Sequence, residues 1–235
     1  EFCRTELLVG EEGIAKLHNS KVIVFGIGGV GSFVVEALTR AGVGNLILVD
    51  NDTICISNIN RQIHARQSTV GMIKVEAMKE RVISINPNCN VEAKQVFITA
   101  ENISEIIPSD VDYVVDAIDT VTSKLALAEY CYKNNINIIS SMGTGNKIDP
   151  TQFRVSDVFK TKVCPLAKVM RYELRKRGVK KLKVVYSEEM PMTPDKGRAV
   201  PSQKRQTPGS ISFVPPVAGM IIGGEVIKDL TGLNK

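Results

Sequence analysis

The stretch KVIVFGIGGVGSFVVEALTRAGVGNLILVD, residues 21–50, decides the fold of this chain of 235 residues. Its apolar run at 22–25 is typical of a strand that is buried on both faces. A glycine turn follows, and then residues 32–40 have the spacing of a helix that ends before Gly42. Residues 46–49 form a second apolar run. This order of strand, turn, helix and strand predicts a unit with two parallel strands and a right-handed crossover.

The alternation of strands and helices continues on both sides of this unit. We expect further helices at 7–17, 70–84 and 120–134, and further strands at 91–96, 113–117 and 136–140. The pattern predicts an α/β fold with a Rossmann-like, doubly wound, mainly parallel sheet. We expect residues 1–155 to form a nucleotide-binding core and residues 156–235 to form a C-terminal extension of the same domain.

The C-terminal extension is less regular. We expect a helix within 163–177, a strand at 180–187, and a long mobile loop at 188–209, where prolines interrupt any periodicity. Residues 211–227 are almost uncharged, but Pro215 and Pro216 interrupt them and a membrane-spanning helix needs roughly 20 residues. A strand and then a buried helix at 217–230 is therefore preferred over stable membrane attachment.

Composition limits the classes of function. The net charge of +5 is weak evidence for an anionic partner, and the absence of Trp argues against an aromatic platform for stacking bases. The five cysteines contain no CxxC pair, which argues against a structural zinc site. An odd number of cysteines without a signal peptide fits a reducing, cytoplasmic environment.

The glycine turn predicts a nucleotide site. Gly26, Gly28 and Gly31 match GxGxxG between a strand and a helix, and Gly29 lies in the same turn. Such glycines let the backbone approach a phosphate at the N-terminus of a helix. Asp50 ends the next strand, where its carboxylate can accept hydrogen bonds from ribose hydroxyls. An NAD-dependent oxidoreductase, an ATP-binding enzyme and a turn without a ligand all remain compatible with this motif.

Polar residues beyond the second strand favour ATP. Amides can hold phosphate or ribose oxygens, and cations can neutralise a triphosphate and its leaving pyrophosphate, whereas a nicotinamide needs apolar contacts. The candidate residues are Asp52, Asn58, Arg61, Gln62 and Lys74. Asp119 follows a strand at the same expected edge of the sheet, where a carboxylate suits Mg²⁺. Each residue taken singly also fits a solvated loop, but their joint placement favours a site.

Four motifs together resemble the ubiquitin-activating-enzyme-like (ThiF-type) superfamily of ATP-dependent adenylyltransferases. They are GIGGVGS, VDNDTICISNINRQ, VGMIK and VVDAIDTVTSK, and the resemblance covers residues 4–155. It implies that the counterparts of Asp50, Asn58, Arg61 and Lys74 bind ATP and that the counterpart of Asp119 holds Mg²⁺. It also implies a homodimer in which Arg4 reaches into the partner's nucleotide site.

Further motifs resemble the branch of this superfamily that dehydrates threonylcarbamoyladenosine at position 37 of tRNA. They are NRQIHA, AEYCYKNNI, GTGNKIDPTQFRVSDVFKT and PLAKVMRYELRKRG. This resemblance implies that ATP converts the carboxylate of the substrate to an acyl-adenylate and that the carbamoyl group of the same nucleoside then closes a ring. The nucleophile belongs to the substrate, so the enzyme needs no reactive cysteine, and the last cysteine here is Cys164.

Two alternatives stay open. The first is an adenylyltransferase that activates a ubiquitin-like sulfur-carrier protein, although such bacterial enzymes typically carry two CxxC pairs. The second is an RNA-binding module that only retains an ATP site. The sequence leaves open whether a sulfur-relay protein is a partner.

A basic segment at 171–183 offers a candidate surface for tRNA, because Lys and Arg neutralise phosphates. A solvated helix face is the alternative. The candidate tRNA-binding residues are Arg171, Arg175, Lys176, Arg177, Lys180 and Lys181.

Overall fold

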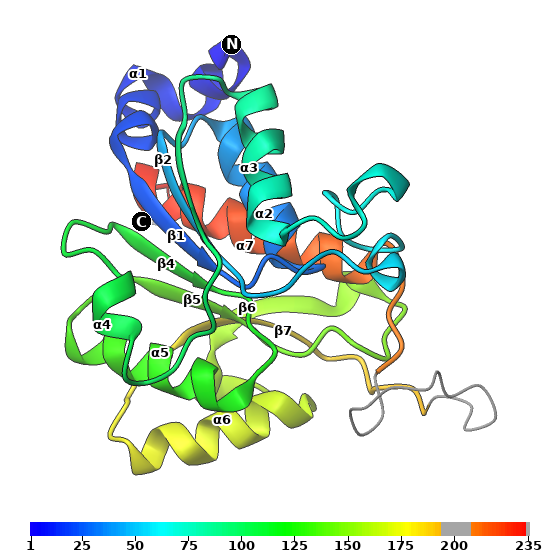
Figure 1. The fold of residues 1–235 in the computed structure, drawn as a ribbon. Helices are drawn as coiled ribbons and strands as arrows, with labels where there is room; N and C mark the ends of the chain where they lie inside the picture. Colours follow the sequence, from blue (N-terminus) through cyan, green and yellow to red (C-terminus); the bar gives the residue numbers. More distant parts are fainter. Residues whose placement is uncertain (194–207, 234–235) are drawn as a thin grey trace.

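A seven-stranded sheet forms the centre of the computed structural model, which describes residues 1–193 and 208–233. The strand order is β3-β2-β1-β4-β5-β7-β6, and all neighbours are parallel except β6 and β7 (Figure 1). The strands are β1 (Lys21–Phe25), β2 (Asn45–Val49), β3 (Asn90–Lys94), β4 (Tyr113–Asp116), β5 (Ile138–Ser141), β6 (Phe153–Asp157) and β7 (Lys183–Ser187). The predicted α/β, Rossmann-like class is confirmed.

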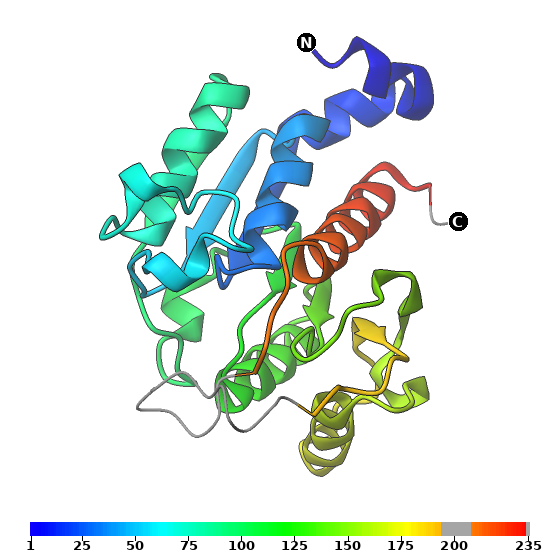
Figure 2. The ribbon, with the colours of Figure 1, turned by 90° about the vertical axis from the view of Figure 1, so that its right-hand side faces the viewer.

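Helices cover both faces of the sheet (Figures 1 and 2). They are α1 (Cys3–Asn19), α2 (Gly31–Ala41), α3 (Lys74–Ile85), α4 (Ile103–Ile106), α5 (Val121–Lys133), α6 (Pro165–Lys176) and α7 (Val214–Thr231). Side chains alternate along β1, so Val22 and Val24 pack with α1, α2, α3 and α7. Ile23 and Phe25 pack with α4 and α5 on the other face.

Two parts of the C-terminal extension differ from the expectation. In the described residues 208–213 no strand leads into α7, because the helix already begins at Val214 and its first turn contains Pro215 and Pro216. Proline is tolerated there since the first N–H groups of a helix have no intrahelical acceptor. The edge strand β6 has no counterpart in the expected elements. Most of the predicted loop at 188–209 lies outside the described residues.

Helix α7 packs closely on α2 and reaches the end of the sheet that bears the glycine turn (Figure 2). The contact depends on Gly219, where a Cβ would lie 2.4 Å from the carbonyl oxygen of Val30. The N-terminus of α7 therefore lies beside the N-terminus of α2. Within the described ranges, no helix has both the length and the apolar character that crossing a membrane requires.

Candidate functional site

The glycine turn joins β1 to α2 and packs on the end of β4. Gly26 has a φ of 85°, in the region that favours glycine, and a Cβ on it would lie 2.6 Å from the carbonyl oxygen of Ala117. Around Gly28 the backbone is open, because the nearest atom to a Cβ placed there is Gln62 Nε2 at 4.0 Å. The space above Gly28 is therefore accessible to a ligand that approaches the backbone.

The N-terminus of α2 points into the same region. No side chain caps this helix, and its N–H groups at Ser32 and Phe33 donate to Gly28 O and Val30 O. The N–H groups of residues 28–30, in the turn before the helix, have no backbone acceptor among the described residues and can serve as donors to a ligand. Together with the helix dipole, these donors make a suitable place for a phosphate. The structure thus brings the four predicted glycines into one turn that can receive an anion.

Asp50 lies at the end of β2 and is bonded to this turn. Its Oδ2 accepts a hydrogen bond from Ile27 N at 2.7 Å, and its Oδ1 accepts one from Asp52 N at 2.9 Å. Burial raises the pKa of Asp50, whereas the Lys74 ammonium and these two N–H groups oppose the rise. The carboxylate therefore holds the turn in place and keeps further lone pairs for hydroxyl donors.

Lys74 is the first residue of α3, and its side chain is 8% exposed. Its Nζ lies 2.8 Å from Asp52 Oδ2 and 3.9 Å from Asp50 Oδ1. The structure therefore brings together three of the predicted residues, Asp50 and Asp52 from the segment after β2 and Lys74 from the start of α3. Their carboxylates keep a cation at the mouth of the site, which would have to share its contacts with an incoming phosphate.

The NINRQ segment, residues 58–62, lies across the glycine turn. The Cγ of Arg61 is 3.3 Å from the place that a Cβ on Gly29 would take. Its Nη1 donates to Ser57 O at 2.9 Å and to Asn60 Oδ1 at 2.8 Å. Burial lowers the pKa of the guanidinium, but arginine remains protonated in proteins. Arg61 thus provides a fixed positive charge over the turn.

Asn58 and Gln62 differ in what they do. Asn58 Oδ1 accepts a hydrogen bond from Cys55 N at 3.0 Å, so this side chain caps the short helix of residues 56–58. Gln62 is buried, and its Oε1 has no hydrogen-bond partner among the described residues. Its amide nitrogen faces Gly28 and is available as a donor to a ligand.

His64 is buried two residues beyond Gln62, and neither ring nitrogen has a partner in the described part of the chain. Burial, with the nearby charges of Lys74 and Arg81, lowers its pKa to about 4. The imidazole is therefore neutral near pH 7. The sequence analysis assigned it no role.

Asp119 is exposed in the turn after β4, next to the glycine turn. Among the described residues, no group of three or more His, Cys, Asp or Glu side chains is arranged to hold a metal ion. A single carboxylate suits Mg²⁺ only when substrate phosphates and water complete its coordination. The donor set here fits that type of site.

A buried ion pair below this turn was missed by the sequence analysis. Asp116 and Lys124 have side chains that are 0% exposed, and their charged atoms are 2.9 Å apart. The sequence signal was present, because VVDAIDTVTSK contains both residues. Asp116 lies inside the apolar run of the expected strand, where the pattern does not distinguish it as a site residue, whereas Asp119 follows the strand.

Arg4 is not part of this assembly within one chain. It lies in the first turn of α1, and the neighbouring Phe2 ring packs 3.3 Å from where a Cβ on Gly42 would be, at the C-terminal end of α2. The glycine turn lies at the opposite end of this 11-residue helix, which is about 16 Å long at 1.5 Å per residue.

The basic segment is partly occupied by contacts within the protein. Arg171 donates to Thr161 O at 3.0 Å, Arg177 lies 2.9 Å from a Glu129 oxygen, and Lys176 lies 3.2 Å from a Glu173 oxygen. Arg175 stacks on the Phe159 ring at 5.3 Å. Lys180 and Lys181 are exposed and form no ion pair with the described residues.

Asn146, which the sequence analysis also missed, contacts both described segments that flank residues 194–207. We call residues 188–193 the first arm and residues 208–213 the second arm. The backbone N–H of Asn146 donates to Gly209 O at 2.7 Å, its Oδ1 accepts from Gly209 N at 2.6 Å, and its carbonyl accepts from Met192 N at 2.8 Å. The second arm then passes the NINRQ segment, where Asn60 Nδ2 donates to Ser210 O at 3.0 Å. These contacts place residues 209–215 along the edge of the site.

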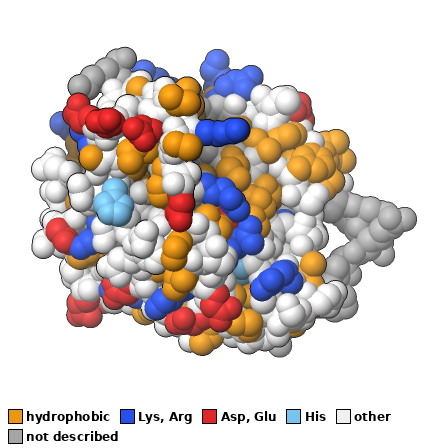
Figure 3. Space-filling view, turned by 90° about the horizontal axis from the view of Figure 1, so that it is seen from above, with side chains coloured by type: hydrophobic (Ala, Val, Ile, Leu, Met, Phe, Trp, Pro, Cys, Tyr) orange, Lys and Arg blue, Asp and Glu red, His pale blue; other side chains and the backbone are white. Residues whose placement is uncertain are grey.

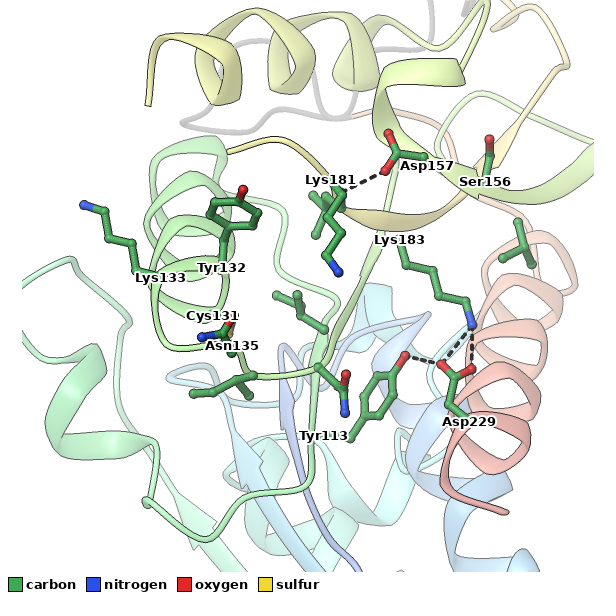
Figure 4. A pocket seen from close by; sticks show the side chains of 15 residues that line it. Tyr113, Cys131, Tyr132, Lys133, Asn135, Ser156, Asp157, Lys181, Lys183 and Asp229 are labelled. Carbon is green, nitrogen blue, oxygen red and sulfur yellow. Dashed lines mark hydrogen bonds and ion pairs between the residues drawn. The ribbon is translucent and has the colours of Figure 1, made fainter. Parts of the chain in front are cut away.

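A cavity of about 920 Å³ lies at the opposite end of the sheet, where the parallel strands begin (Figure 4). Tyr113, Ile138 and Lys183, the first residues of β4, β5 and β7, line it, and the Lys183 ammonium points to the Asp229 carboxylate at 2.8 Å. None of the predicted nucleotide-binding residues contributes to this cavity.

Comparison with known proteins adds to this geometry. The family model described as "ThiF family" matches residues 2–235. The tRNA threonylcarbamoyladenosine dehydratase of Bacillus subtilis is 47% identical over 239 residues, covering 98% of this chain and 94% of that protein. The adenylyltransferase and sulfurtransferase UBA4 of Vanderwaltozyma polyspora is 37% identical over 138 residues, covering 59% of this chain and 31% of that protein.

The fold agrees with a solved structure of the E. coli tRNA N6-threonylcarbamoyladenosine dehydratase in complex with ATP. The TM-score is 0.90 and the sequence identity 35%, and the alignment covers 99% of this chain and 94% of that chain.

Proposed function

This chain belongs to the ThiF family, and from that premise we propose that it catalyses the ATP-dependent dehydration of N6-threonylcarbamoyladenosine at position 37 of tRNA. The observation that carries the proposal is the extent of the similarity. The match to the B. subtilis dehydratase runs through 98% of the chain, including the C-terminal extension, whereas the match to UBA4 covers 59%.

The reaction has two steps that balance. A carboxylate oxygen of the threonylcarbamoyl group attacks the α-phosphorus of ATP, and pyrophosphate leaves. The carbamoyl group of the same nucleoside then attacks the activated carbonyl carbon and loses a proton, and AMP leaves with the former carboxylate oxygen. The net result is the loss of one water from the nucleoside, and no protein thiol is needed. The cysteine nearest the C-terminus, Cys164, is buried.

The residues of the site suit the first step. The glycine turn and the N-terminus of α2 would bind phosphates, and Asp50 would bind the ribose. Arg61 lies over Gly29, and the Lys74 ammonium lies 2.8 Å from Asp52 Oδ2. Both cations would offset the negative charge that develops as pyrophosphate leaves. Gln62 and Asn58 would supply amide donors at the same edge.

Asp119 would hold Mg²⁺ together with the phosphates of ATP. The ion supplies charge neutralisation on the phosphate oxygens when it is bound. Supporting this role, Asp119 is exposed and lies one residue beyond Ile118 in the turn that packs against Gly26 and Gly31.

A homodimer would complete the site with Arg4 of the second copy. In support, Arg4 lies far from the glycine turn of its own chain, and Leu7 and Leu8 of the same helix are 86% and 81% exposed. Apolar side chains are visible among charged ones on the face that Figure 1 has at its top (Figure 3). Contiguous exposed apolar patches are a feature of association surfaces.

The test is mass spectrometry of nucleosides from modified tRNA after incubation with the protein and ATP. Loss of one water from threonylcarbamoyladenosine, with release of AMP and pyrophosphate, is the expected result. If a ubiquitin-like carrier protein triggers pyrophosphate release and modified tRNA does not, the protein is instead a carrier-activating adenylyltransferase. ATP binding without pyrophosphate release in either case would leave only a binding module.

A further inference from the structure

We propose that the buried pair of Asp116 and Lys124 positions the turn that carries Asp119, and that both are positioning residues for metal-dependent adenylation. The inference rests on the proposed function, because it assumes that Asp119 holds the metal ion. It concerns two residues that do not themselves face the substrate.

The pair is fully enclosed and uses each of its polar atoms. Lys124 is in the first turn of α5, and its Nζ lies 2.9 Å from Asp116 Oδ2. Ser140 Oγ on the neighbouring strand β5 donates to the same oxygen at 2.5 Å. Both charged side chains are 0% exposed. The pair therefore connects α5, β4 and β5 at the edge of the sheet where the nucleotide residues meet.

Ile118 is gripped by both members of the pair. Its N–H donates to Asp116 Oδ1 at 3.1 Å, and its carbonyl accepts from Lys124 Nζ at 3.1 Å. Because the N–H and the carbonyl of Ile118 are both held, the peptide groups on either side of this residue are fixed, and with them the backbone that leads into Asp119. Asp119 is exposed, and its Oδ1 accepts a long hydrogen bond of 3.5 Å from Thr120 Oγ1.

The same turn sets the position of the glycine turn. Ala117 N donates to Phe25 O at 2.8 Å, and its carbonyl oxygen is 2.6 Å from where a Cβ on Gly26 would be. A rotation of the Ala117–Ile118 peptides would therefore move the metal ligand relative to the phosphate-binding backbone. The ion pair holds these two parts of the site in one arrangement.

The core does not need charges at these positions. Burying two ions costs desolvation energy, and well-packed apolar residues of similar size often serve stability as well or better. The ionic pair makes directed hydrogen bonds to the N–H and the carbonyl of Ile118, which an apolar pair cannot make. A positioning role and a purely structural role therefore predict different behaviour for an apolar replacement.

The experiment compares Lys124→Met and the double variant Asp116→Leu/Lys124→Met with Lys133→Met. Lys133 lies at the other end of α5, where its side chain is 65% exposed and pairs with Glu129, so this control makes the same chemical change away from the turn. The double variant removes both charges and guards against unfolding caused by a single buried charge. Ser140→Ala is a milder third variant, since it removes only the hydroxyl that donates to Asp116.

Two readouts are needed besides thermal unfolding. Hydrogen–deuterium exchange of a peptide covering residues 116–124 reports on the turn without any metal. Electron paramagnetic resonance measures Mn²⁺ binding to the complex with a non-hydrolysable ATP analogue. Nucleotide binding without metal, measured by calorimetry in EDTA, is the reference for the phosphate turn.

For the apolar variants we expect exchange of the Ile118 amide to be at least tenfold faster and the Mn²⁺ dissociation constant to rise about tenfold, a loss of ~1.4 kcal/mol. Metal-free ATP affinity should change by less than about threefold, which is under ~0.7 kcal/mol. Lys124→Arg, which keeps a cation near the pair, should restore part of the metal affinity. Ser140→Ala should shift both readouts in the same direction by a smaller amount.

A folded apolar variant with wild-type exchange and Mn²⁺ affinity would overturn the inference, as would equal changes in Lys133→Met. If both apolar variants fail to fold, Ser140→Ala decides, and unchanged exchange at residue 118 in that variant would refute it. Asp119→Ala separates the two proposals. Unaltered Mn²⁺ binding in that variant would refute the metal role of Asp119 within the proposed function, whatever the state of the turn.

Discussion

Pro215 of α7 lies against Gly29 of the glycine turn, with its Cβ 3.1 Å from the position that a Cβ on Gly29 would occupy. Residues almost two hundred positions apart therefore share one wall of the candidate nucleotide site. The C-terminal helix thus restricts the space for a side chain at residue 29, and so does Arg61, whose Cγ lies 3.3 Å from the same Cβ position. A methyl group at Gly29 has no room unless one of them moves.

Gly29→Ala should therefore weaken ATP binding by about tenfold, or ~1.4 kcal/mol, because the added Cβ displaces Pro215 or the Arg61 side chain. Gly28→Ala should weaken binding as well but leave stability almost unchanged, since the protein itself leaves space there. Calorimetric titration with ATP and thermal unfolding measure the two effects.

Gly224→Ala is the matched control for these variants. This glycine lies inside α7, and no atom is within 4 Å of a Cβ placed on it. Alanine should stabilise the helix by about 0.5–1 kcal/mol and leave ATP affinity unchanged. Loss of nucleotide binding in this control would mean that α7 acts on the site through its whole length and not through Pro215.

Arg61→Ala should lower turnover more than it weakens ATP binding. The guanidinium is held by Ser57 and Asn60 over the turn, so it contributes most as negative charge develops on the leaving pyrophosphate. Pyrophosphate exchange gives the turnover and calorimetry gives the affinity. Equal losses in the two measurements would make Arg61 a ground-state clamp.

The strands of the sheet could be predicted from sequence to different extents. The buried runs of β1 and β2 and the turn between them are local patterns, so their ends were predicted within one residue. The strand β6 was missed because Arg154 and Val155 are both exposed on an edge strand. No apolar alternation marks it, and its pairing with β7 is decided by tertiary contacts.

Residues that act through others were the hardest to predict. Lys124 and Asn146 gain their roles from partners on other elements, Asp116 on β4 and Gly209 in the second arm. Helical spacing accounts for Lys124 equally well as a solvated residue, so its complete burial is visible only in the structure. The start of α7 was mispredicted for a local reason. Pro215 and Pro216 were expected to interrupt the segment before the helix, but they lie in the first turn of α7, which begins at Val214.

Arg4 is expected to act in the partner's site. Arg4→Ala and Asp119→Ala homodimers should each be nearly inactive, but their heterodimer contains one site in which both residues are intact. With free exchange of subunits, an equimolar mixture should recover about a quarter of the wild-type activity, since half of the dimers are mixed and each has one working site. Activity no higher than the mean of the parents, despite demonstrated exchange, would place Arg4 outside the partner's site.

His64 should make stability depend on pH in the acid range. Its pKa is about 4 in the folded protein against 6.5 for an ordinary histidine, so the unfolded chain binds more protons between these values. Stability from the neutral ring is complete above pH 6.5 and is lost as the pH falls towards 4, on the order of 3 kcal/mol in all.

Urea unfolding at several pH values tests this dependence. His64→Leu should flatten the fall in stability between pH 6.5 and 4, because no group at this position then gains a proton on unfolding. His18→Leu is the control, since the other histidine of the chain is exposed. A wild-type slope in His64→Leu would assign the dependence to carboxylates instead.

The last prediction concerns the candidate surface for tRNA. Among the six predicted cations, Lys180 and Lys181 are exposed and carry no ion pair with described residues, whereas Arg171, Lys176 and Arg177 already have partners. A cation that must leave a carboxylate contributes less net affinity than one that meets phosphate directly. Lys180→Ala/Lys181→Ala should therefore weaken tRNA binding more than Lys176→Ala/Arg177→Ala.

Salt dependence measures how many phosphate contacts are lost. Each contact removed should reduce the slope of log affinity against log salt by roughly 0.7 to 0.9, because fewer counterions are released. We expect a reduction near twice that value for the Lys180 and Lys181 double variant and a smaller one for Lys176 and Arg177, with ATP affinity unchanged in both.

Lys16→Ala/Lys79→Ala on α1 and α3, which lie at the opposite end of the molecule from α6 (Figure 1), should keep the wild-type slope. If all three double variants have the same slope as the wild type, the segment at 171–183 is a solvated face and tRNA binds elsewhere. If the Lys16 and Lys79 variant alone loses slope, the tRNA surface lies on the side of α1 and α3.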